Sequence, residues 1–585
     1  MPKPASYWDK FTQSRISRRR ALQMAAVGGA SAGAIWIVGC GGDDDDENGQ
    51  ATPSGNGNGE VITGGTFRGS VSLVLGKDPH KASTFLTHAL ASQAYSRLLR
   101  FKTTTGELRQ DEWYTTENEL ASQVETPDDT TYIFTIRPEA KFQNLPPVNG
   151  REVTGEDVVY SFNRYSEISP NKANLSMVDS VTADGKTVTF KLKEPFGLFR
   201  NRIASFQDLW IMPREFVEQS ETASEDSMLG SGPFIFERFE PNVVMSWRKN
   251  PDYWETDDQG NQLPYLDGVQ LDIITDQNQV LSQFAAGALD SIFVPPQLLN
   301  NVRSQNPNAI IDGAMRNVLS FLYFEPASYT AGKPPFNDER VRQGMSMIIN
   351  RDALLSRISD EGGGWPNLIN AGFGESWWLN PKGDDIGDAG KYYQYNLDEA
   401  RALFEAAGVG DGFNTPMHYS STVYTTIVPY YDIVRQSLPA LLEEANISVE
   451  QRGEEYGVYI SKTFGRGEFE GFTFGLESVF SDIAAYWTNM FYPRDAGGGR
   501  NHSSVSDATL NDRIAAMLRI QDLEELREAN FDLQRYVSEK MYYVPVVTPV
   551  EFSARQPRLK NVQNTTGPTT YATGTEGYLR LMKEA

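Results

Sequence analysis

Cysteine is nearly absent from this sequence, because Cys40 is the only one among 585 residues. No disulfide can form within the chain, so a protein of this size must be held together by its hydrophobic cores. Basic residues are also outnumbered, with 53 Lys and Arg against 77 Asp and Glu and a net charge of −24. Residues 1–39 are themselves basic, which leaves the remainder at −29. Such a chain should avoid nucleic acid and anionic lipid.

Motifs for metal, nucleotide or acid–base chemistry are missing from the sequence. There is no H-E-x-x-H pair and no G-x-x-x-x-G-K-[ST] loop, so any ATP hydrolysis must occur on a partner protein. Neighbouring acidic pairs such as Glu443-Glu444 and Glu454-Glu455 point apart and are predicted to be solvated. We expect four scattered histidines to be surface or internally hydrogen-bonded residues: His80, His88, His418 and His502. The sequence thus predicts no catalytic residue, no metal site and no cofactor.

A long uninterrupted apolar run is missing too. The most apolar stretch, residues 21–38, is broken by glycines and lies near the lower edge of the about 20 residues that a bilayer span needs. It contains Gly29-Ala30-Ser31-Ala32-Gly33, which matches the G-x-S-x-G pattern of a serine nucleophile. That pattern requires a buried strand before it and a helix after it. Here it follows an arginine cluster near the N-terminus, so we expect no nucleophile.

The N-terminal segment has the three parts of an export signal. Residues 15–20 are basic, residues 21–38 are apolar, and Ile37-Val38-Gly39-Cys40 forms a small-residue cleavage site that ends in cysteine. This arrangement resembles a bacterial lipoprotein signal. A cysteine thiol can be alkylated by a lipid and the freed amine acylated, which gives the multi-chain attachment that stable anchoring requires. We therefore predict a signal peptide over residues 1–40, lipidation at Cys40 and attachment to the membrane through that lipid.

The export route and the following linker can also be interpreted. Arg18 and Arg19 resemble the twin-arginine export motif, although Ala21 stands where that motif carries a bulky apolar residue. Twin-arginine and general secretory export both stay open. Residues 41–60 are rich in Gly, Asp and Asn without apolar periodicity, which predicts a flexible, self-repelling linker. A metal site at Asp43–Asp46 is not expected, because ordering adjacent carboxylates on such a segment is costly.

The remaining chain, about 525 residues long, alternates strand pairs with capped helices. The run TTYIFTIR places Tyr132, Phe134 and Ile136 on one strand face, and residues 178–195 predict a hairpin that turns at Asp184-Gly185. Two helices are predicted from their caps: one begins after Asn396 and stops at Gly408, and the other begins after Asn337 or Asp338. This mixture favours an α/β or α+β fold.

Several segments occur in the order seen in one family. They include TYIFTIRPEAKFQNLPPVNGREVTGEDVVYSFNRY, GSGPFIFERFEPNVVMSWRKNPDYW, PYLDGVQLDII, PFNDERVRQGMSMIINRDAL and NLDEARALFEAAG. From about residue 65 to the C-terminus the chain resembles the family 5 extracellular solute-binding proteins. These are the oligopeptide, dipeptide and nickel receptors of ABC importers.

The resemblance implies a two-lobed fold of the periplasmic-binding type with a small domain inserted in lobe one. Residues 61–90, 205–325 and 545–585 would form lobe one, residues 91–204 the inserted domain and residues 326–544 lobe two. The implied function is a lipid-anchored, extracytoplasmic receptor that captures an oligopeptide-like solute between its lobes. It would act as a monomer and deliver the solute to a membrane permease. An oligosaccharide receptor of the same fold and a secreted carbohydrate-acting enzyme are the alternatives.

Candidate solute-binding residues follow from the same resemblance. Peptide receptors of the family carry a D-Y-x-D-P-like segment followed by an aromatic residue, and its first aspartate pairs with the peptide ammonium. The matching stretch is GLESVFSDIAAYWTNMF, where Val479 replaces that aspartate. Either Glu477 or Asp482 would then bind the ammonium, or the solute has none. Aromatic faces for the solute are expected from Tyr486, Trp365, Trp377, Trp378 and Trp487, although core packing is the other role open to each tryptophan.

Overall fold

The computed structural model describes residues 61–82, 84–102, 115–315, 319–358, 363–365, 368–369, 373, 376–421, 428–477, 480, 482–496, 498–562 and 581–584. The predictions for Arg18, Arg19, Cys40 and the linker 41–60 lie outside these residues, as does the G-x-S-x-G pattern. Residues 61–585 form one compact unit. Among the described residues, no helix combines the length and the apolar character that crossing a bilayer demands.

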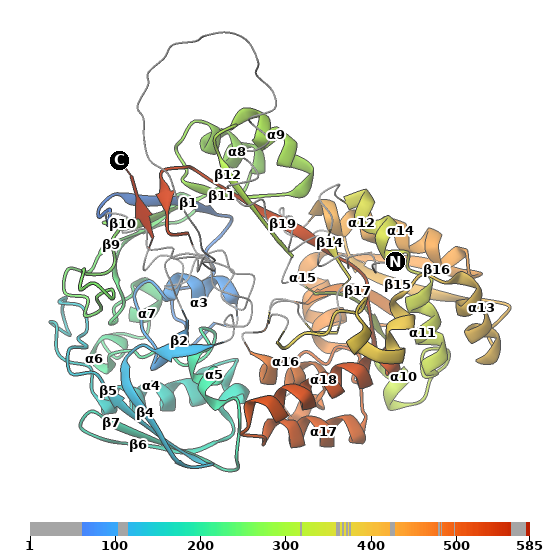
Figure 1. Cartoon of the computed structure of the whole chain (residues 1–585), viewed down its shortest axis with the longest axis horizontal. Helices are drawn as coiled ribbons and strands as arrows, with labels where there is room; N and C mark the ends of the chain where they lie inside the picture. The colour runs from blue at the N-terminus through green and yellow to red at the C-terminus, as the bar shows by residue number, and fades with distance from the viewer. Residues whose placement is uncertain are drawn as a thin grey trace, which may run out of the picture. The chain divides into compact units, whose positions relative to one another are not determined.

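Three sheets are built mainly from the first half of the chain (Figure 1). One has the order β1 (Thr66–Val71), β10 (Gly268–Ile273), β9 (Val244–Lys249) and β8 (Phe234–Glu240). The second has the order β4 (Ala121–Asp128), β5 (Thr131–Ile136), β7 (Thr187–Leu192) and β6 (Val178–Asp184). In the third, β19 (Thr548–Arg555) lies between β11 (Ser291–Val294) and β12 (Ile310–Met315) and also pairs with β14 (Gly363–Gly364). Two strand pairs complete these parts: β2 (Leu99–Phe101) with β3 (Thr116–Asn118), and β20 (Leu559–Lys560) with β21 (Met582–Lys583).

The second half of the chain contributes a mixed sheet of order β16 (Ile447–Glu454), β15 (Phe413–Ser420), β17 (Phe472–Glu477), β13 (Leu319–Phe324) and β18 (Tyr543–Pro545). β15 runs parallel to both β16 and β17, whereas β13 is antiparallel to β17 and β18. We call residues 319–545 the second lobe, because their described strands other than β14 share this sheet. We call residues 61–315 with 548–562 the first lobe.

Helices cover these sheets in both lobes (Figure 1). The helices of the first lobe are α3 (Phe85–Ala91), α4 (Gly155–Ile168), η2 (Lys172–Leu175), α5 (Phe199–Ala204), α6 (Arg214–Val217), α7 (Ala223–Asp226), α8 (Gln277–Ala285), η3 (Pro296–Leu298) and α9 (Leu299–Gln305). Those of the second lobe are α10 (Pro326–Thr330), α11 (Glu339–Met347), α12 (Arg351–Ile358), η5 (Asp384–Tyr393), α13 (Leu397–Ala406), α14 (Val428–Glu443), α15 (Tyr456–Val458), the π-helix η6 (Tyr459–Phe464), α16 (Ile483–Phe491), η7 (Arg494–Ala496), α17 (Ala508–Leu518) and α18 (Leu523–Lys540).

The locally predicted elements are confirmed. Tyr132, Phe134 and Ile136 are buried on β5, and β6 and β7 form the hairpin, with Gly185 in the left-handed region at φ +59°. The backbone N–H of Glu399 donates to the Asn396 side chain at the start of α13. Asp338, rather than Asn337, caps α11.

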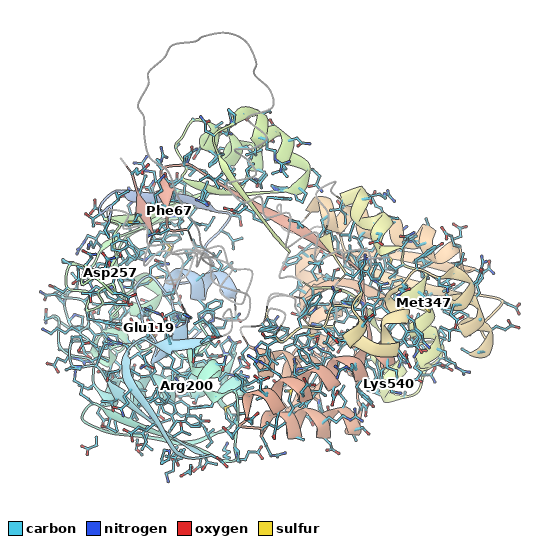
Figure 2. All side chains as sticks on the ribbon, in the orientation of Figure 1. Phe67, Glu119, Arg200, Asp257, Met347 and Lys540 are labelled. Atoms are coloured by element: carbon cyan, nitrogen blue, oxygen red, sulfur yellow. The ribbon has the colours of Figure 1, made fainter. Side chains whose placement is uncertain are left out.

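Each lobe has its own hydrophobic core. Phe67 lies in a core of the first lobe and Met347 in that of the second (Figure 2). In the second lobe, α11 and α13 approach closely, because a Cβ atom on Gly344 would lie 2.5 Å from the Phe404 ring. Glycine at this position therefore lets an aromatic side chain fill the space between two helices.

The chain crosses between the lobes at two adjacent places, after β12 and after β18. The buried Ser320 of β13 joins these crossings, because its Oγ donates to the Val547 carbonyl at 2.7 Å and its own carbonyl accepts the Val546 N–H at 2.9 Å. The separate domain limits predicted from the sequence, including the insertion 91–204, stay a proposal. The pairing of β13 and β18 favours a second lobe that includes Leu319 and Pro545.

We expect Phe404→Ala to lower the free energy of unfolding by about 3–5 kcal/mol, because it removes a ring that is 2% exposed and leaves a cavity between α11 and α13. The neighbouring Glu405 is exposed, so Glu405→Ala should change it by no more than about 0.5 kcal/mol. Urea unfolding of both variants measures the difference. Equal losses would show that the packing of Phe404 does not stabilise the second lobe.

Candidate functional site

The carboxyl ends of three parallel strands meet at one edge of the second-lobe sheet. β15 ends at Ser420, β16 at Glu454 and β17 at Glu477. In open α/β sheets, ligands bind outside the carboxyl ends of the strands. The segment after β17 leads to α16 and carries most of the predicted solute-binding residues, although Val479 lies outside the described residues. We therefore take this edge as the candidate site.

Glu477 is buried at the end of β17, and each of its carboxylate oxygens faces a nitrogen of the protein. Its Oε1 accepts a hydrogen bond from Nη1 of Arg500, and its Oε2 lies 2.9 Å from Nε2 of His502. Burial alone would raise the pKa of the Glu477 carboxyl, but the Arg500 charge and the His502 hydrogen bond hold it below its ordinary value. The carboxylate is therefore ionised and already neutralised by the protein.

Both ring nitrogens of His502 face hydrogen-bond acceptors. Its Nδ1 lies 2.6 Å from the Phe464 carbonyl oxygen, and its Nε2 lies 2.9 Å from Oε2 of Glu477. The Phe464 ring stacks on the His502 ring at 3.6 Å between centroids. Phe464 ends the π-helix η6, and such turns are frequent at functional sites.

Asp482 joins the two lobes. It caps α16, because its Oδ1 accepts the Ala485 N–H at 2.8 Å, and the same oxygen accepts a hydrogen bond from Nη2 of Arg202 on α5 at 3.2 Å. Both side chains are almost fully buried. Burial raises the pKa of Asp482 and the nearby Asp208 adds to this, although the Arg202 charge opposes them. Within the described part of the chain, Oδ2 of Asp482 has no hydrogen-bond partner.

Tyr486 and Trp487 are packed inside the second lobe. Both side chains are 0% exposed, and their rings meet edge to face at 5.4 Å. Nε1 of Trp487 donates to Oδ1 of Asn530 on α18 at 2.9 Å. Nδ2 of Asn530 in turn donates to the Trp377 carbonyl at 2.8 Å, so this amide connects two of the predicted tryptophans.

The other two predicted tryptophans, Trp365 and Trp378, lie between α12 and η5 in the sequence. Trp378 is 6% exposed next to Trp377. Trp365 is partly buried; its Nε1 donates to Asp352 at 2.8 Å and Lys382 lies 3.9 Å above its ring. The structure thus brings Glu477, Asp482, Tyr486 and Trp487 together but gives Trp365 different neighbours. That these residues bind solute stays a prediction.

The sequence did not predict the partners that complete this site. Arg202 and Asp482 are 280 positions apart, and Arg500 stands in a glycine-rich stretch without periodicity. The prediction of surface or internally hydrogen-bonded histidines is confirmed for His80, His88 and His502, which are buried and hydrogen-bonded. Glu454 is not simply solvated, because it accepts a hydrogen bond from Thr463 at 2.6 Å and lies 2.7 Å from Nδ1 of His418.

A second contact between the lobes lies beside the Arg202–Asp482 pair, where α5 adjoins α17 and α18 (Figure 1). The Gly197 N–H donates to the Leu518 carbonyl at 2.8 Å. Arg519 pairs with Glu194 at 2.5 Å on the exposed side. A Cβ atom on Gly197 would lie 1.8 Å from the Ile520 carbonyl oxygen, so only glycine fits while the lobes touch here.

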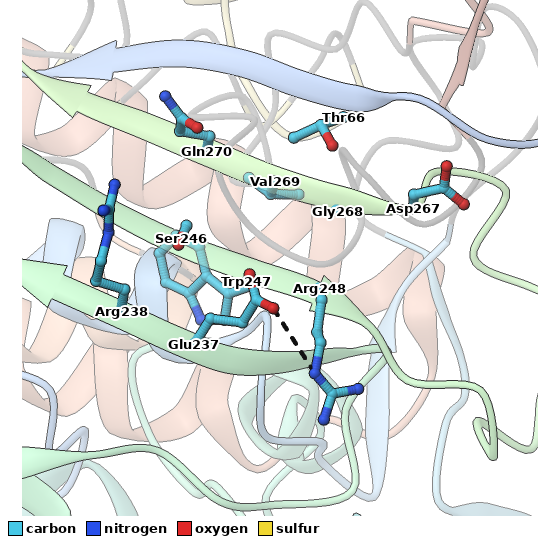
Figure 3. A pocket seen from close by; sticks show the side chains of 10 residues that line it. All are labelled: Thr66, Glu237, Arg238, Ser246, Trp247, Arg248, Asp267, Gly268, Val269 and Gln270. Carbon is cyan, nitrogen blue, oxygen red and sulfur yellow. Dashed lines mark ion pairs between the residues drawn. The ribbon is translucent and has the colours of Figure 1, made fainter.

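A separate hollow of about 460 Å³ lies on the first-lobe sheet of β1, β10, β9 and β8 (Figure 3). Its lining is polar and includes Arg238, Gln270 and an exposed pair, Glu237–Arg248, at 3.7 Å. All of its lining residues belong to the first lobe or its sheet edge. A solute held there would contact one lobe only and could not favour closure of two. We therefore do not assign the solute site to it.

Comparison with known proteins agrees with this architecture. Residues 115–498 match the family described as bacterial extracellular solute-binding proteins, family 5 middle. Di/tripeptide-binding protein 1 of Pseudomonas aeruginosa (strain UCBPP-PA14) is 23% identical over 476 residues, which cover 76% of this chain and 82% of that protein.

Two solved structures show the same fold. The periplasmic binding protein DppA from Helicobacter pylori, in complex with peptide STSA, matches with a TM-score of 0.70 and 21% identity, over 90% of this chain and 99% of that chain. The binding protein AgaA from A. tumefacien R10, in complex with agropinic acid, matches with a TM-score of 0.71 and 20% identity, over 89% and 99%. The predicted two-lobed, mixed α/β fold is confirmed.

We expect Gly197→Ala to disrupt the contact between the lobes without unfolding either lobe, because its backbone can accept a side chain but Ile520 and Leu526 of the second lobe leave no room for one. An overlap of this kind costs about 1–3 kcal/mol. Small-angle scattering should report a larger radius of gyration. Gly76→Ala is the matched control, since a Cβ atom there would lie 3.6 Å from a Glu225 side-chain oxygen. Unchanged scattering by Gly197→Ala would contradict this interpretation.

Proposed function

The chain belongs to the family 5 bacterial extracellular solute-binding proteins and is the substrate-binding protein of an ABC importer, and we propose that it is a lipid-anchored receptor for an oligopeptide-like solute. The family match over residues 115–498 carries the proposal. Contacts between the lobes support it, because Arg202 and Asp482 join α5 to α16 at the edge where the solute is expected.

Binding energy is the whole mechanism of such a receptor. A solute that contacts both lobes stabilises the closed state by its differential affinity for the two states, and only that difference shifts the population. The adjacent crossings at Ser320 allow this motion, because a few residues at a hinge can absorb it. No chemical step on the solute is proposed.

The proposal also names a class of solute. Peptides lead, because the Helicobacter pylori protein holds peptide STSA and the Pseudomonas aeruginosa relative is named for di- and tripeptides. An oligosaccharide receptor of the same fold is the second candidate, since the A. tumefacien structure holds agropinic acid rather than a peptide. The residues predicted from the sequence, Glu477, Asp482, Tyr486 and the four tryptophans, are proposed to form or support the solute site.

We expect a bound solute to compact and stabilise the protein, whereas ATP or a divalent metal alone should do neither. At a hundred times its dissociation constant, a solute that binds one site adds about 2.7 kcal/mol to the free energy of unfolding. Melting curves and small-angle scattering with a mixed peptide pool and with cello- and xylo-oligosaccharides measure both effects. A solute that binds by calorimetry yet leaves scattering unchanged would refute closure between the lobes.

We expect the mature protein to remain with the membrane through a lipid on Cys40, and Cys40→Ser to release or stall it, because no other cysteine is available. Membrane and soluble fractions of cells that produce each version test this. Ser31→Ala, which alters the same segment without touching the thiol, is the control. If the Cys40→Ser variant stays with the membrane as much as the native protein does, the proposed lipid anchor is wrong.

A further inference from the structure

The candidate site contains more positive than negative charge, although the chain as a whole is strongly acidic. We define the arginine cluster as Glu477, Phe480, Arg494, Arg500 and His502. Glu477 is the one carboxylate among them, and its two oxygens face Arg500 and the ring of His502. An ammonium that approached Glu477 would have to displace one of these two nitrogens and would be repelled by the Arg500 charge.

Arg500 has hydrogen-bonding capacity left for a partner. Its guanidinium lies 4.8 Å above the Phe480 ring, and its side chain is 29% exposed. Within the described residues only Nη1 has a protein acceptor, Glu477, so the donors on Nε and Nη2 have none. A planar guanidinium fixed by an aromatic face on one side and a buried carboxylate at one corner presents its remaining donors in a defined direction.

Arg494 adds a second positive charge without an acidic partner. Its Nη1 donates to the Gly465 carbonyl at 2.6 Å and its Nε to the Asn501 carbonyl at 3.2 Å. Nη2 is buried and has no acceptor in the part of the chain that the structure describes. No described carboxylate forms an ion pair with Arg494, and burial lowers its pKa, as expected for a desolvated cation without a counterion.

Asp482 is not an open ammonium site either. It is fully buried, and its Oδ1 already serves Arg202 and the Ala485 N–H. Its Oδ2 has no partner among the described residues, but an ammonium drawn to it would compete with the buried Arg202 for the same carboxylate. Both carboxylates that the sequence offered for an ammonium are therefore already paired with arginines of the protein.

On the premise of the proposed function, we propose that the arginine cluster binds a carboxylate of the solute and that no ammonium is bound at this edge. The solute is thus an acid, a peptide held by its C-terminal carboxylate. Arg500 makes the direct contact, and Arg494 keeps the local charge positive.

Three versions of one random tetrapeptide pool test the proposal on the full-length protein by calorimetry: unmodified, N-acetylated and C-amidated. N-acetylation should leave the affinity within about two-fold, whereas C-amidation should weaken it about ten- to a hundred-fold, which is the effect of losing a charge-assisted hydrogen bond. The opposite pattern, with acetylation damaging and amidation harmless, would overturn the proposal while leaving the receptor function intact.

Substitutions within the arginine cluster test the role of each residue. Arg500→Gln should abolish the discrimination between the unmodified and amidated pools, and Arg500→Lys should retain part of it because the charge remains. Glu477→Gln should weaken the unmodified and the N-acetylated pools by the same factor, because it loosens Arg500 without touching an ammonium; a loss confined to the unmodified pool would instead mean that Glu477 holds an ammonium. If melting curves show that Arg500→Gln fails to fold, the Arg500→Lys variant and the three pools decide the question.

A neutral cello- and xylo-oligosaccharide set completes the experiment. Should oligosaccharides bind equally well to the native protein and to Arg500→Gln, the receptor function stands and the requirement for an acid is wrong. Should no pool and no oligosaccharide bind, the proposed function itself fails, and this inference fails with it.

Discussion

The hydrogen bonds of Ser320 are the constraint on which the two-lobed arrangement depends. One buried residue holds the strand that enters the second lobe and, through Val546 and Val547, the segment that leaves it. Neither crossing can slide relative to the other without breaking these bonds inside a dry environment. Rotation about these two crossings is the motion that the Ser320 bonds permit, and contacts far from them, such as Gly197 with Leu518, are those that such a rotation would change most.

Ion pairs with a buried carboxylate connect parts of this chain that are distant in the sequence. Disulfides can make such connections in other proteins. Asp290 accepts from Arg558 at 2.7 Å and lies 2.9 Å from Nζ of Lys583, which ties the C-terminal strands to the first lobe. Arg97 pairs with Glu119 with both side chains fully buried. Removing either partner of the Arg97–Glu119 pair costs about 3–5 kcal/mol, because the other charge stays buried. A chain without disulfides is thus sensitive to single substitutions at these positions.

The local elements could be predicted because their signals are local. The cap at Asn396, the turn at Gly185 and the alternation in β5 each involve residues that lie within a few positions of one another. The cap of α16 could have been predicted in the same way, since Asp482 directly precedes an apolar run. Because Asp482 was interpreted as a carboxylate for the solute, its role as a helix cap was not predicted.

Partners distant in the sequence could not be predicted. Nothing near Asp482 points to Arg202, and nothing near Trp487 points to Asn530, although both contacts decide what those residues do. The acidic composition gave no sign of the arginine cluster either. Arg494 begins the short helix η7 and Arg500 follows it, and only the fold decides where this segment lies. Composition reports the average charge of a surface and not the charge at one edge of a sheet.

The contrast between the acidic chain and its basic site has a kinetic consequence. Residues 40–585 carry −29, so a negatively charged solute is repelled at distances beyond the site and attracted only within it. Salt screens the distant repulsion over about 8 Å at physiological ionic strength but acts less on a partly buried contact. The association rate of an acidic solute should therefore rise with ionic strength, opposite to the usual behaviour of electrostatically steered binding, and a solute without charge should associate at a rate that salt leaves unchanged.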